Sequence, residues 1–561
     1  MPLKLLLLMG FLLWTGFLIG QSDAKTAQIS GNFQANANFF IRDSLIGAAN
    51  TPQYDRQLYG AEAWLNLNYS NWGFDFGVRF DIFNNSNLLN PTDSYSDEGI
   101  GNWFIHKQID ELELSVGYLY DQIGSGIIFR AFEERPLLID NALVGARLKY
   151  NFNDNWYVKG FTGRQKQLFD TYASVIKGLN VEGFISTGTH IKGINFAPGF
   201  GIVNRTLDDN SMNALVASIN TYTAQDAFVP KYNAYAFTLY NTLSTGNLTW
   251  YLETAYKTKD AINDPFAETL IDGDTIVGDR FINKSGTVLY TSLAYAAQGL
   301  GITLEAKRTA NFTFRTRPQV QLNRGMVNFL PPMARVNTYR LLSRYNAATQ
   351  ELGEQALQLD LRYAPSRDLK FNLNFSNIWN LDNDLLYREI YLETYYKIDR
   401  FWSITGGIQW QEYNQEIFEF KPEVPILGGL TPFVDVLYKI GNRRSLRFEV
   451  QYKGVGQDQA VALKQDYGDW VFALAEYSIA PSWSFSLSDM YNVGPGRNSP
   501  QDALGKPKAI HYPRLDLSYT SGGNRFDLSY VKQVEGVVCT GGICRLEPAF
   551  SGVRFTVNSN F

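Results

Sequence analysis

The sequence is poor in the residues from which metal centres and disulfide scaffolds are made. Its 561 residues include two cysteines and three histidines, His106, His190 and His511. Two cysteines exclude a disulfide-rich scaffold and a multi-cysteine metal cluster. Three histidines this far apart argue against a histidine-based metal enzyme. The sequence therefore predicts no metal and no cofactor.

Charge is scarce as well. Charged residues make up 19% of the chain, whereas soluble proteins carry about 25%. The 50 lysines and arginines are balanced by 55 aspartates and glutamates, so there is no basic excess that would attract a nucleic acid. Beyond residue 24, no run of the sequence approaches the roughly 20 consecutive apolar residues that a membrane helix needs.

The first 24 residues form a separate segment. One basic residue, Lys4, precedes an apolar run from Leu5 to Gly20 and a small-x-small ending at 22–24. This order is typical of a secretory signal peptide over residues 1–24, so we expect the mature domain to span residues 25–561. The alternative, an N-terminal membrane anchor, lacks the basic flank that would follow it.

Aromatic residues are abundant, at 15% of the chain, and apolar and polar residues alternate. Every second residue is apolar from Leu357 to Tyr363, and the alternation resumes from Leu369 to Phe375 after a break at 364–368. Successive side chains of a β-strand point to opposite faces, whereas a helix with this spacing would spread its apolar residues around the whole circumference. The pattern predicts a β-hairpin, and similar units recur along the chain.

These hairpins are expected to form a barrel in a membrane. Short turns of Gly, Asn, Asp, Pro and Ser alternate with long polar connections, and the stretch 165–190 fits either a loop or an extra strand. A soluble sandwich or propeller would carry more charge on its polar face, while these positions are mostly Asn, Ser, Thr, Gln and Gly. We predict an all-β fold, a large transmembrane antiparallel β-barrel of about 24 strands (about 22–26).

Two features favour an outer membrane. Five tryptophans fall near predicted strand ends, where interfacial belts would hold them: Trp379, Trp402, Trp410, Trp470 and Trp483. The chain closes on an alternating strand from Phe550 to Phe561, and a terminal aromatic residue resembles the signal that directs barrels to the outer membrane; the alternative is an ordinary edge strand. We expect the outer membrane of a Gram-negative cell, with its lipid as a partner and both termini in the periplasm, because the strand number is even.

A barrel this wide cannot be filled by the side chains of its wall, so we expect inward-folded loops to fill part of the lumen. The strongest candidate is the segment 124–141, which mixes charged with bulky apolar residues. Its candidate lumen-constriction residues are Phe129, Arg130, Glu133, Glu134, Arg135 and Asp140. The alternative is a solvated surface loop with incidental ion pairs.

A cationic stretch runs from Lys307 to Arg344. It holds eight basic residues and no acidic one, and arginine binds carboxylates and phosphates through paired hydrogen bonds. The candidate anion-attracting residues are Arg315, Arg317, Arg324, Arg335, Arg340 and Arg344. They would either attract anions into the lumen, contact the phosphates of surface lipids, or pair with acidic neighbours elsewhere in the fold.

Two smaller features lie in predicted outer loops. Six acidic residues crowd 260–279, but the D-x-D-x-D-G spacing of a calcium loop is absent, and a solvated acidic loop is the simpler interpretation. Cys539 and Cys544 enclose four residues, two of them glycine. In an oxidising compartment this spacing predicts a disulfide that staples the loop.

Three parts of the sequence resemble a known family. They are Gly126–Pro136 with Asp140–Ala142, Pro230–Tyr235, and Val538–Arg545 with Pro548. Together they resemble an uncharacterised family of large outer-membrane β-barrel proteins from Bacteroidota, a domain of unknown function, over nearly the whole mature chain. The resemblance implies a Gram-negative outer-membrane location and transfers neither a substrate nor a catalytic residue.

The predicted function is a channel or porin-like transporter for a small solute, in which the segment 124–141 narrows the lumen. The alternative is a non-transporting scaffold that docks protein partners in secretion or envelope assembly. None of the three histidines has a recognisable catalytic partner in the sequence. We therefore do not expect an enzyme.

Overall fold

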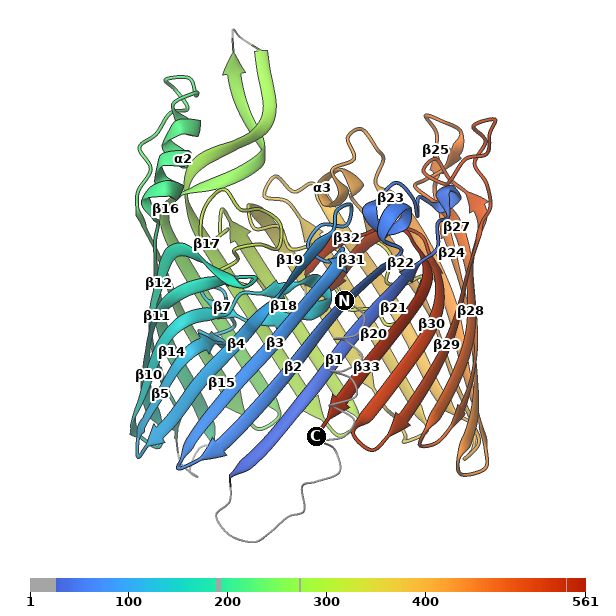
Figure 1. The fold of residues 1–561 in the computed structure, drawn as a ribbon, viewed down its shortest axis with the longest axis horizontal. Coiled ribbons are helices and arrows are strands. Elements are labelled where there is room, and N and C mark those ends of the chain that lie inside the picture. The colour runs from blue at the N-terminus through green and yellow to red at the C-terminus, as the bar shows by residue number, and fades with distance from the viewer. Residues whose placement is uncertain (1–26, 188–192, 272–273, 541) are drawn as a thin grey trace.

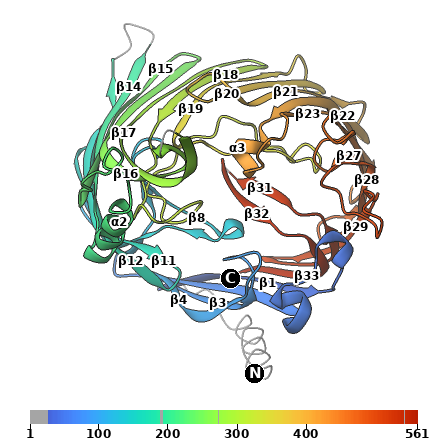
Figure 2. The ribbon, with the colours of Figure 1, turned by 90° about the horizontal axis from the view of Figure 1, so that it is seen from above.

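The computed structural model describes residues 27–187, 193–271, 274–540 and 542–561. Over this part of the chain the protein is a closed antiparallel β-barrel, seen from the side in Figure 1 and from above in Figure 2. The main sheet has 25 described strands; β13 (Ile185–Ser186) continues β12 against β14, so 24 strands complete the wall. The predicted strand number is confirmed. No helix in the described ranges is long and apolar enough to cross a membrane.

The wall strands run up and down in chain order. The first twelve are β1 (Gln28–Phe40), β2 (Tyr59–Asn71), β3 (Phe74–Ser86), β4 (Tyr95–Ile109), β5 (Leu112–Leu119), β10 (Leu143–Asn153), β11 (Trp156–Gln167), β12 (Asp170–Gly183), β14 (Ile194–Thr206), β15 (Asn233–Thr245), β16 (Leu248–Ile271) and β17 (Asp274–Ala297). The other twelve are β18 (Leu300–Ala310), β19 (Gly353–Tyr363), β20 (Leu369–Trp379), β21 (Leu385–Lys397), β22 (Trp402–Tyr413), β23 (Leu427–Ile440), β24 (Arg444–Val455), β27 (Gly468–Ile479), β28 (Trp483–Pro495), β29 (His511–Ser521), β30 (Asn524–Gln533) and β33 (Phe550–Asn560). The ring closes where β1 pairs with β33, from Asn32 opposite Asn560 to Phe40 opposite Gly552.

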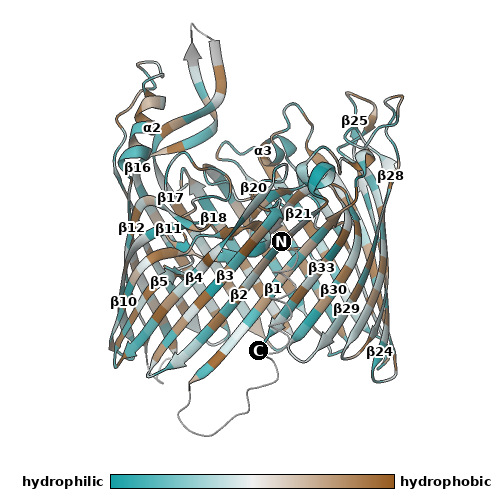
Figure 3. Cartoon of the chain, viewed as in Figure 1, coloured by the Kyte–Doolittle hydropathy of each residue, from teal (hydrophilic) through white to brown (hydrophobic). Residues whose placement is uncertain are grey.

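The alternation of the sequence points polar side chains inward and apolar side chains outward. In β24, every second residue from Phe448 to Tyr452 is apolar and 42–49% exposed. Their polar neighbours Glu449, Gln451 and Lys453 are at most 4% exposed. Figure 3 shows this alternation of hydrophobic and hydrophilic residues along the strands. A soluble sheet buries its apolar face, whereas this sheet buries its polar face, as is typical of a membrane barrel.

Short turns close one end of the barrel, the turn end, and long connections gather at the other, the loop end (Figure 1). The described hairpins of the turn end use two to five residues, as at 72–73, 154–155 and 246–247. β1 begins and β33 ends at this same end. The predicted order of short and long connections is confirmed, with two exceptions.

Both exceptions are strands where a long connection was expected. The stretch 165–190 contains β12, so the alternative of an extra strand is correct there. Ile176 of this strand faces inward but is fully buried under a loop, so apolar residues point to both faces and the alternation is blurred. The stretch 258–282 extends β16 and β17 into a two-stranded ribbon that rises past the rim (Figure 1).

Short elements lie in the connections. They are η1 (Ser44–Ile46), η2 (Gln53–Gln57), η3 (Arg135–Leu137), α2 (Asp209–Ile219), α3 (Gln415–Glu419), β6 (Asp121–Gln122), β7 (Arg130–Ala131), β8 (Glu133–Glu134), β9 (Ile139–Asp140), β25 (Gln457–Asp458), β26 (Leu463–Lys464), β31 (Gly536–Thr540) and β32 (Ile543–Glu547). Figure 2 shows β8, α3, β31 and β32 inside the ring. The predicted signal peptide, residues 1–24, lies outside the described residues and stays a prediction.

Candidate functional site

Two long connections fold into the lumen. Loop A, residues 120–142, joins β5 to β10, and loop B, residues 311–352, joins β18 to β19. The pair β31–β32, the inner hairpin, lies beside them (Figure 2). The loops bond to each other: the amide of Arg130 donates to the carbonyl of Val327, and that of Phe329 donates to the carbonyl of Gly126, both at 2.9 Å. The prediction that inward-folded loops partly fill the lumen is confirmed.

Loop A is held first by an apolar anchor. Its residues Ile123, Ile127, Ile128 and Phe129 are at most 3% exposed and pack in one cluster with inward-facing apolar residues of the wall. The ring of Phe129 lies 4.4 Å from the ring of Phe161 in β11. Phe129 therefore packs against the inner face of the wall.

Beside this anchor, one buried arginine gathers three carboxylates. Arg79 of β3 is 3% exposed and contacts Asp81 of its own strand at 2.7 Å and Glu133 and Asp140 of loop A at 2.6 and 2.8 Å. Lys166 of β11 contacts Asp140 at 2.5 Å. Burial alone would raise the pKa of Asp140, but Lys166 and Arg79 hold this pKa below its usual value. Salt bridges thus hold loop A to two wall strands, β3 and β11.

The remaining predicted constriction residues surround this network. The guanidinium of Arg130 lies over the ring of Phe329, 4.2 Å from its centroid. Arg135 reaches β1, where it donates to Gln34 at 2.9 Å. Glu134 forms no salt bridge with a described residue, and its backbone pairs with β9. All six residues belong to the loop inside the barrel; that they narrow a pore stays a prediction.

Loop B is anchored through its backbone by polar residues of the wall. Gln409 of β22 donates to the carbonyl of Leu342 at 3.2 Å. Gln451 of β24 accepts from the amide of Leu341 at 2.7 Å, and Lys453 donates to the carbonyl of the same residue at 3.3 Å. These three wall side chains are at most 1% exposed. Because loop B has little regular structure, the lumen-facing wall supplies the hydrogen bonds that its backbone needs.

A buried ion pair ties the two ends of loop B together. The ammonium of Lys307, near the end of β18, lies 2.6 Å from Glu354, near the start of β19, and both side chains are at most 1% exposed. Glu354 also accepts from the amide of Gln350 at 2.7 Å, and Lys307 donates to the carbonyl of Pro331. Lys307 therefore adds no free charge to the lumen.

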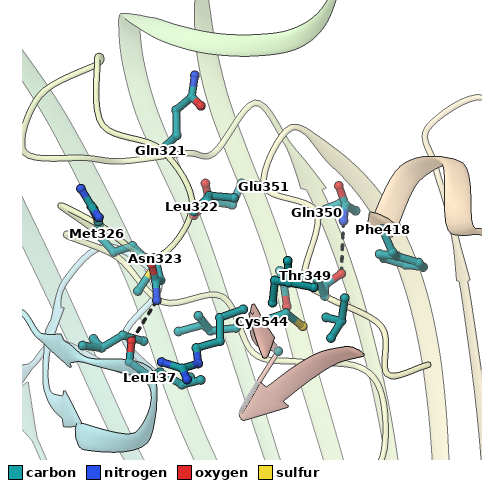
Figure 4. A pocket seen from close by; sticks show the side chains of 18 of the residues that line it. Leu137, Gln321, Leu322, Asn323, Met326, Thr349, Gln350, Glu351, Phe418 and Cys544 are labelled. Atoms are coloured by element: carbon teal, nitrogen blue, oxygen red, sulfur yellow. Dashed lines mark hydrogen bonds between the residues drawn. The ribbon is translucent and has the colours of Figure 1, made fainter. Parts of the chain in front are cut away.

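Between the loops and the rim lies a chamber of about 1560 Å³. Its lining comes from loops A and B, the inner hairpin and α3, and it extends to Phe266 of the ribbon. Figure 4 shows part of this lining, where Asn323 of loop B points to loop A and donates to the carbonyl of Leu137 at 3.1 Å. The inner loops thus fill the barrel only in part.

The chamber carries surplus positive charge. Ten basic and seven acidic residues line it. Six of the acidic residues contact a lysine or arginine, and the seventh, Glu535, accepts a hydrogen bond from Tyr467. Of the predicted anion-attracting residues, Arg315 is neutralised by Glu351 at 2.8 Å. The others form no salt bridge with any described residue: Arg317, Arg324, Arg335, Arg340 and Arg344.

Aromatic rings surround one of these unpaired arginines. The guanidinium carbon of Arg344 lies 5.1 Å from the ring of Trp470, 5.4 Å from that of Tyr467 and 5.5 Å from that of Tyr345. The prediction that Trp470 sits in the outer belt is wrong, because it is 1% exposed and packs inside the barrel. Residues of the connection 41–58 cover the inner face of β27, so apolar residues occupy that face as well.

Two further arginines of the wall escaped the sequence analysis. Arg514 of β29 pairs with Asp516 at 2.8 Å. Arg554 of β33 donates to Asn38 of β1 at 3.0 Å, across the closing seam. In the sequence, each is one polar residue of an alternating strand, and no local signal separates it from its neighbours.

The acidic stretch 260–279 does not gather into one site. Asp260 is buried and contacts Arg205 at 2.7 Å, whereas Asp279 accepts a hydrogen bond from Gln321 of loop B at 3.0 Å. Asp272 lies outside the described residues. Among the described residues, no group of three or more His, Cys, Asp or Glu is placed to hold a metal ion.

The two cysteines belong to the inner hairpin. Cys539 and Cys544 stand opposite each other in the register of β31 and β32. The side chain of Cys539 lies outside the described residues, so the disulfide stays a prediction.

Comparison with known proteins gives a family and distant structural likenesses. The P pilus usher (PapC) translocation pore is similar with a TM-score of 0.40 and 9% identity, over 96% of this chain and 99% of that chain. The siderophore receptor PirA from Pseudomonas aeruginosa is similar with a TM-score of 0.39 and 9% identity, over 96% of this chain and 81% of that chain. Likenesses at this level carry no inference about function.

A comparison with curated proteins finds no match. The prediction of an uncharacterised family is confirmed, while an origin in Bacteroidota stays a prediction. The model of a family of unknown function (DUF6029) matches residues 3–561, and the chain belongs to this family.

Proposed function

We propose that this protein is an outer-membrane barrel that carries a small solute through its lumen, with loops A and B as its gate. The observation that carries the proposal is the partly filled lumen, in which a chamber of about 1560 Å³ lies between the folded loops and the rim. A barrel this wide without inner loops would be a permanent hole. Loops that served only as filling would leave no chamber of this size.

The outer surface supports a membrane location. Apolar side chains cover it, and aromatic rings gather near the turn end. There Trp402 stacks on Tyr438 with ring centroids 4.3 Å apart, and Trp483 contacts Tyr519 at 4.5 Å. Girdles of aromatic residues mark the interfaces of outer-membrane barrels, whose short turns lie in the periplasm and whose longer loops face outward. In that orientation β1 begins and β33 ends on the periplasmic side.

Planar-bilayer recordings of the purified protein test the transport function. The parent should show rare conductance steps, because both loops are bonded to the wall. A variant lacking residues 129–138 of loop A, and one with residues 318–348 of loop B replaced by a short Gly-Ser linker, should each conduct for longer. Shortening the ribbon by residues 267–278 is the matched control, since this segment lies outside the wall and does not line the chamber, and it should leave the conductance unchanged. Silence of all four proteins would contradict the proposal.

A second candidate function is the docking of an envelope or secretion protein, and the ribbon favours it. The pairing of β16 with β15 stops at Lys257, and that of β17 with β18 starts at Thr287. Beyond these residues the two strands pair with each other, as far as the chain is described. Free strand edges bind extended segments of other proteins. Crosslinking that recovers a stoichiometric partner with the parent, but not with the shortened ribbon, would favour docking.

A further inference from the structure

A row of four arginines runs from the chamber along one side of the lumen. It starts at Arg344, among the aromatic rings, and continues to Arg340 in the same loop. Desolvation inside the barrel and repulsion by Arg344 and Arg514 lower the pKa of Arg340 to about 10. The ring of Tyr512 lies 5.7 Å from that of Trp470, and Arg514 follows two residues later on the same face of β29. Ser529 of β30 stands opposite both Asp516 of β29, to which it donates at 2.6 Å, and Arg554 of β33. The four arginines thus follow one side of the lumen, and we call them the arginine row.

Only one of the four members of the row forms a salt bridge with a described residue. Arg514 is the one member with a salt bridge among the described residues, to Asp516 at 2.8 Å. Glu547, the acidic residue that acts on Arg340, is itself held by Arg545. Three of the four guanidinium groups thus form no salt bridge with a described carboxylate, and Asp466 and Glu62 act on Arg344 and Arg554 only from beyond salt-bridge distance.

Buried hydrogen-bond donors beside the row also lack acceptors. The Nε of Arg344, the indole Nε1 of Trp470 and the hydroxyl of Tyr512 have no hydrogen-bond partner in the described structure. Trp470 and Tyr512 are 1% and 3% exposed, and their rings lie 5.7 Å apart. Leaving such donors unpaired is unfavourable. The oxygens of an anion are the acceptors that this neighbourhood lacks.

We propose that the arginine row is an anion-binding path, and that the solute is a small anion with carboxylate, phosphate or sulfate groups. This inference rests on the proposed transport function and names its substrate class. Guanidinium groups bind such oxyanions through paired, charge-assisted hydrogen bonds. The low-dielectric wall of the barrel focuses the field of the row into the lumen. The rings around Arg344 keep its guanidinium at the entrance of the path.

Binding of inorganic phosphate to the full chain in detergent tests the inference without requiring conductance. R340Q and R554Q each remove a member without a salt bridge and should weaken phosphate binding about 10-fold or more, the usual effect of losing a hydrogen bond to a charged group. The matched control is R308Q, because Arg308 is exposed on β18 next to the lumen-facing Lys307 and points to the outer face. R308Q should bind phosphate like the parent. Absence of phosphate binding, or equal loss in R308Q, overturns the inference.

Reversal potentials then separate this inference from the transport function. The variant lacking 129–138 keeps the whole row and should prefer anions, most clearly at low salt, where screening is weak. Adding R554Q should shift its reversal potential toward cations, and R340K, which keeps the charge, should preserve the preference. Heat-modifiable migration on a denaturing gel shows which variants are folded. A conducting barrel without anion preference overturns the inference alone, whereas a silent barrel that binds phosphate through the row overturns the transport function alone.

Discussion

Replacing Arg79 with methionine should loosen loop A without releasing it. In the parent, Arg79 contacts one carboxylate of the wall and two of loop A, each within 2.8 Å. Methionine keeps the length of the side chain but removes the main cation that these carboxylates share. Removing one partner of a buried ion pair costs about 3–5 kcal/mol. This corresponds to a change of roughly 10²- to 10⁴-fold in the docking equilibrium of loop A.

The apolar anchor decides how far the loop then opens. Burial of one large apolar side chain contributes about 1.5–3 kcal/mol. The four anchor residues between Ile123 and Phe129 are almost fully buried, so together they contribute about 6–12 kcal/mol. This exceeds the loss in the charge network. We therefore expect R79M to open in brief bursts and to spend most of its time closed.

Single-channel recordings in planar bilayers measure the effect as burst frequency and open fraction. R447M is the matched control, because Arg447 of β24 contacts Asp435 and Glu449, which both belong to the wall. It should leave the recordings unchanged. A folded R79M barrel that stays open throughout, or one as quiet as the parent, would refute the reasoning.

Three further predictions concern the inner loops. The pKa of Asp140 is lower in the folded protein than in the unfolded chain, where it is about 3.9. The ionised carboxylate therefore stabilises docking of loop A above this value, and that stabilisation is lost as the pH falls through the folded pKa. Burst frequency should thus stay constant from about pH 7 to 5 and rise below about pH 4 in recordings at graded pH; a rise near neutral pH would contradict this. F129A removes the ring packed on Phe161 and should weaken docking of loop A by about 3–5 kcal/mol, seen as faster tryptic cleavage after Arg130; unchanged cleavage would argue against the anchor. The predicted disulfide between Cys539 and Cys544 means that a thiol reagent should find no free thiol before reduction, and a reactive thiol would exclude it.

The wall could be predicted because alternation is a local signal. From Leu369 to Phe375, the face that each side chain takes follows from its neighbours alone. The signal fails where a loop covers the inner wall. Ile176 and Trp470 both face inward and are buried, so their strands carry apolar residues on both faces. In the sequence, the stretch around Ile176 therefore resembles a loop, and Trp470 resembles a residue of the outer aromatic belt.

The site could be predicted only in part, because salt bridges join residues that are far apart in the sequence. The cationic stretch of loop B was visible as a run without acidic residues. Which of its arginines stays free depends on distant partners: Arg315 meets Glu351, 36 residues on, while Arg340 forms no salt bridge with a described residue. Arg79 has the sequence context of any polar residue in an alternating strand. Closure of the barrel creates these neighbourhoods.

Loops A and B also act as internal struts. Loop A contacts β1 through Arg135, β3 through Arg79, and β16 through Ser125, whose amide donates to Glu253 at 3.0 Å. Loop B is bonded to loop A and reaches β22 and β24. Neighbouring strands of a sheet can rotate relative to one another, and the wide range of twist angles seen in proteins shows that this rotation costs little energy. A ring this wide without inner loops would therefore flatten readily. The two loops support the rounded cross-section of Figure 2 from within. Release of either loop would make the whole ring easier to deform. Opening of the lumen and a change in the shape of the barrel would therefore occur together.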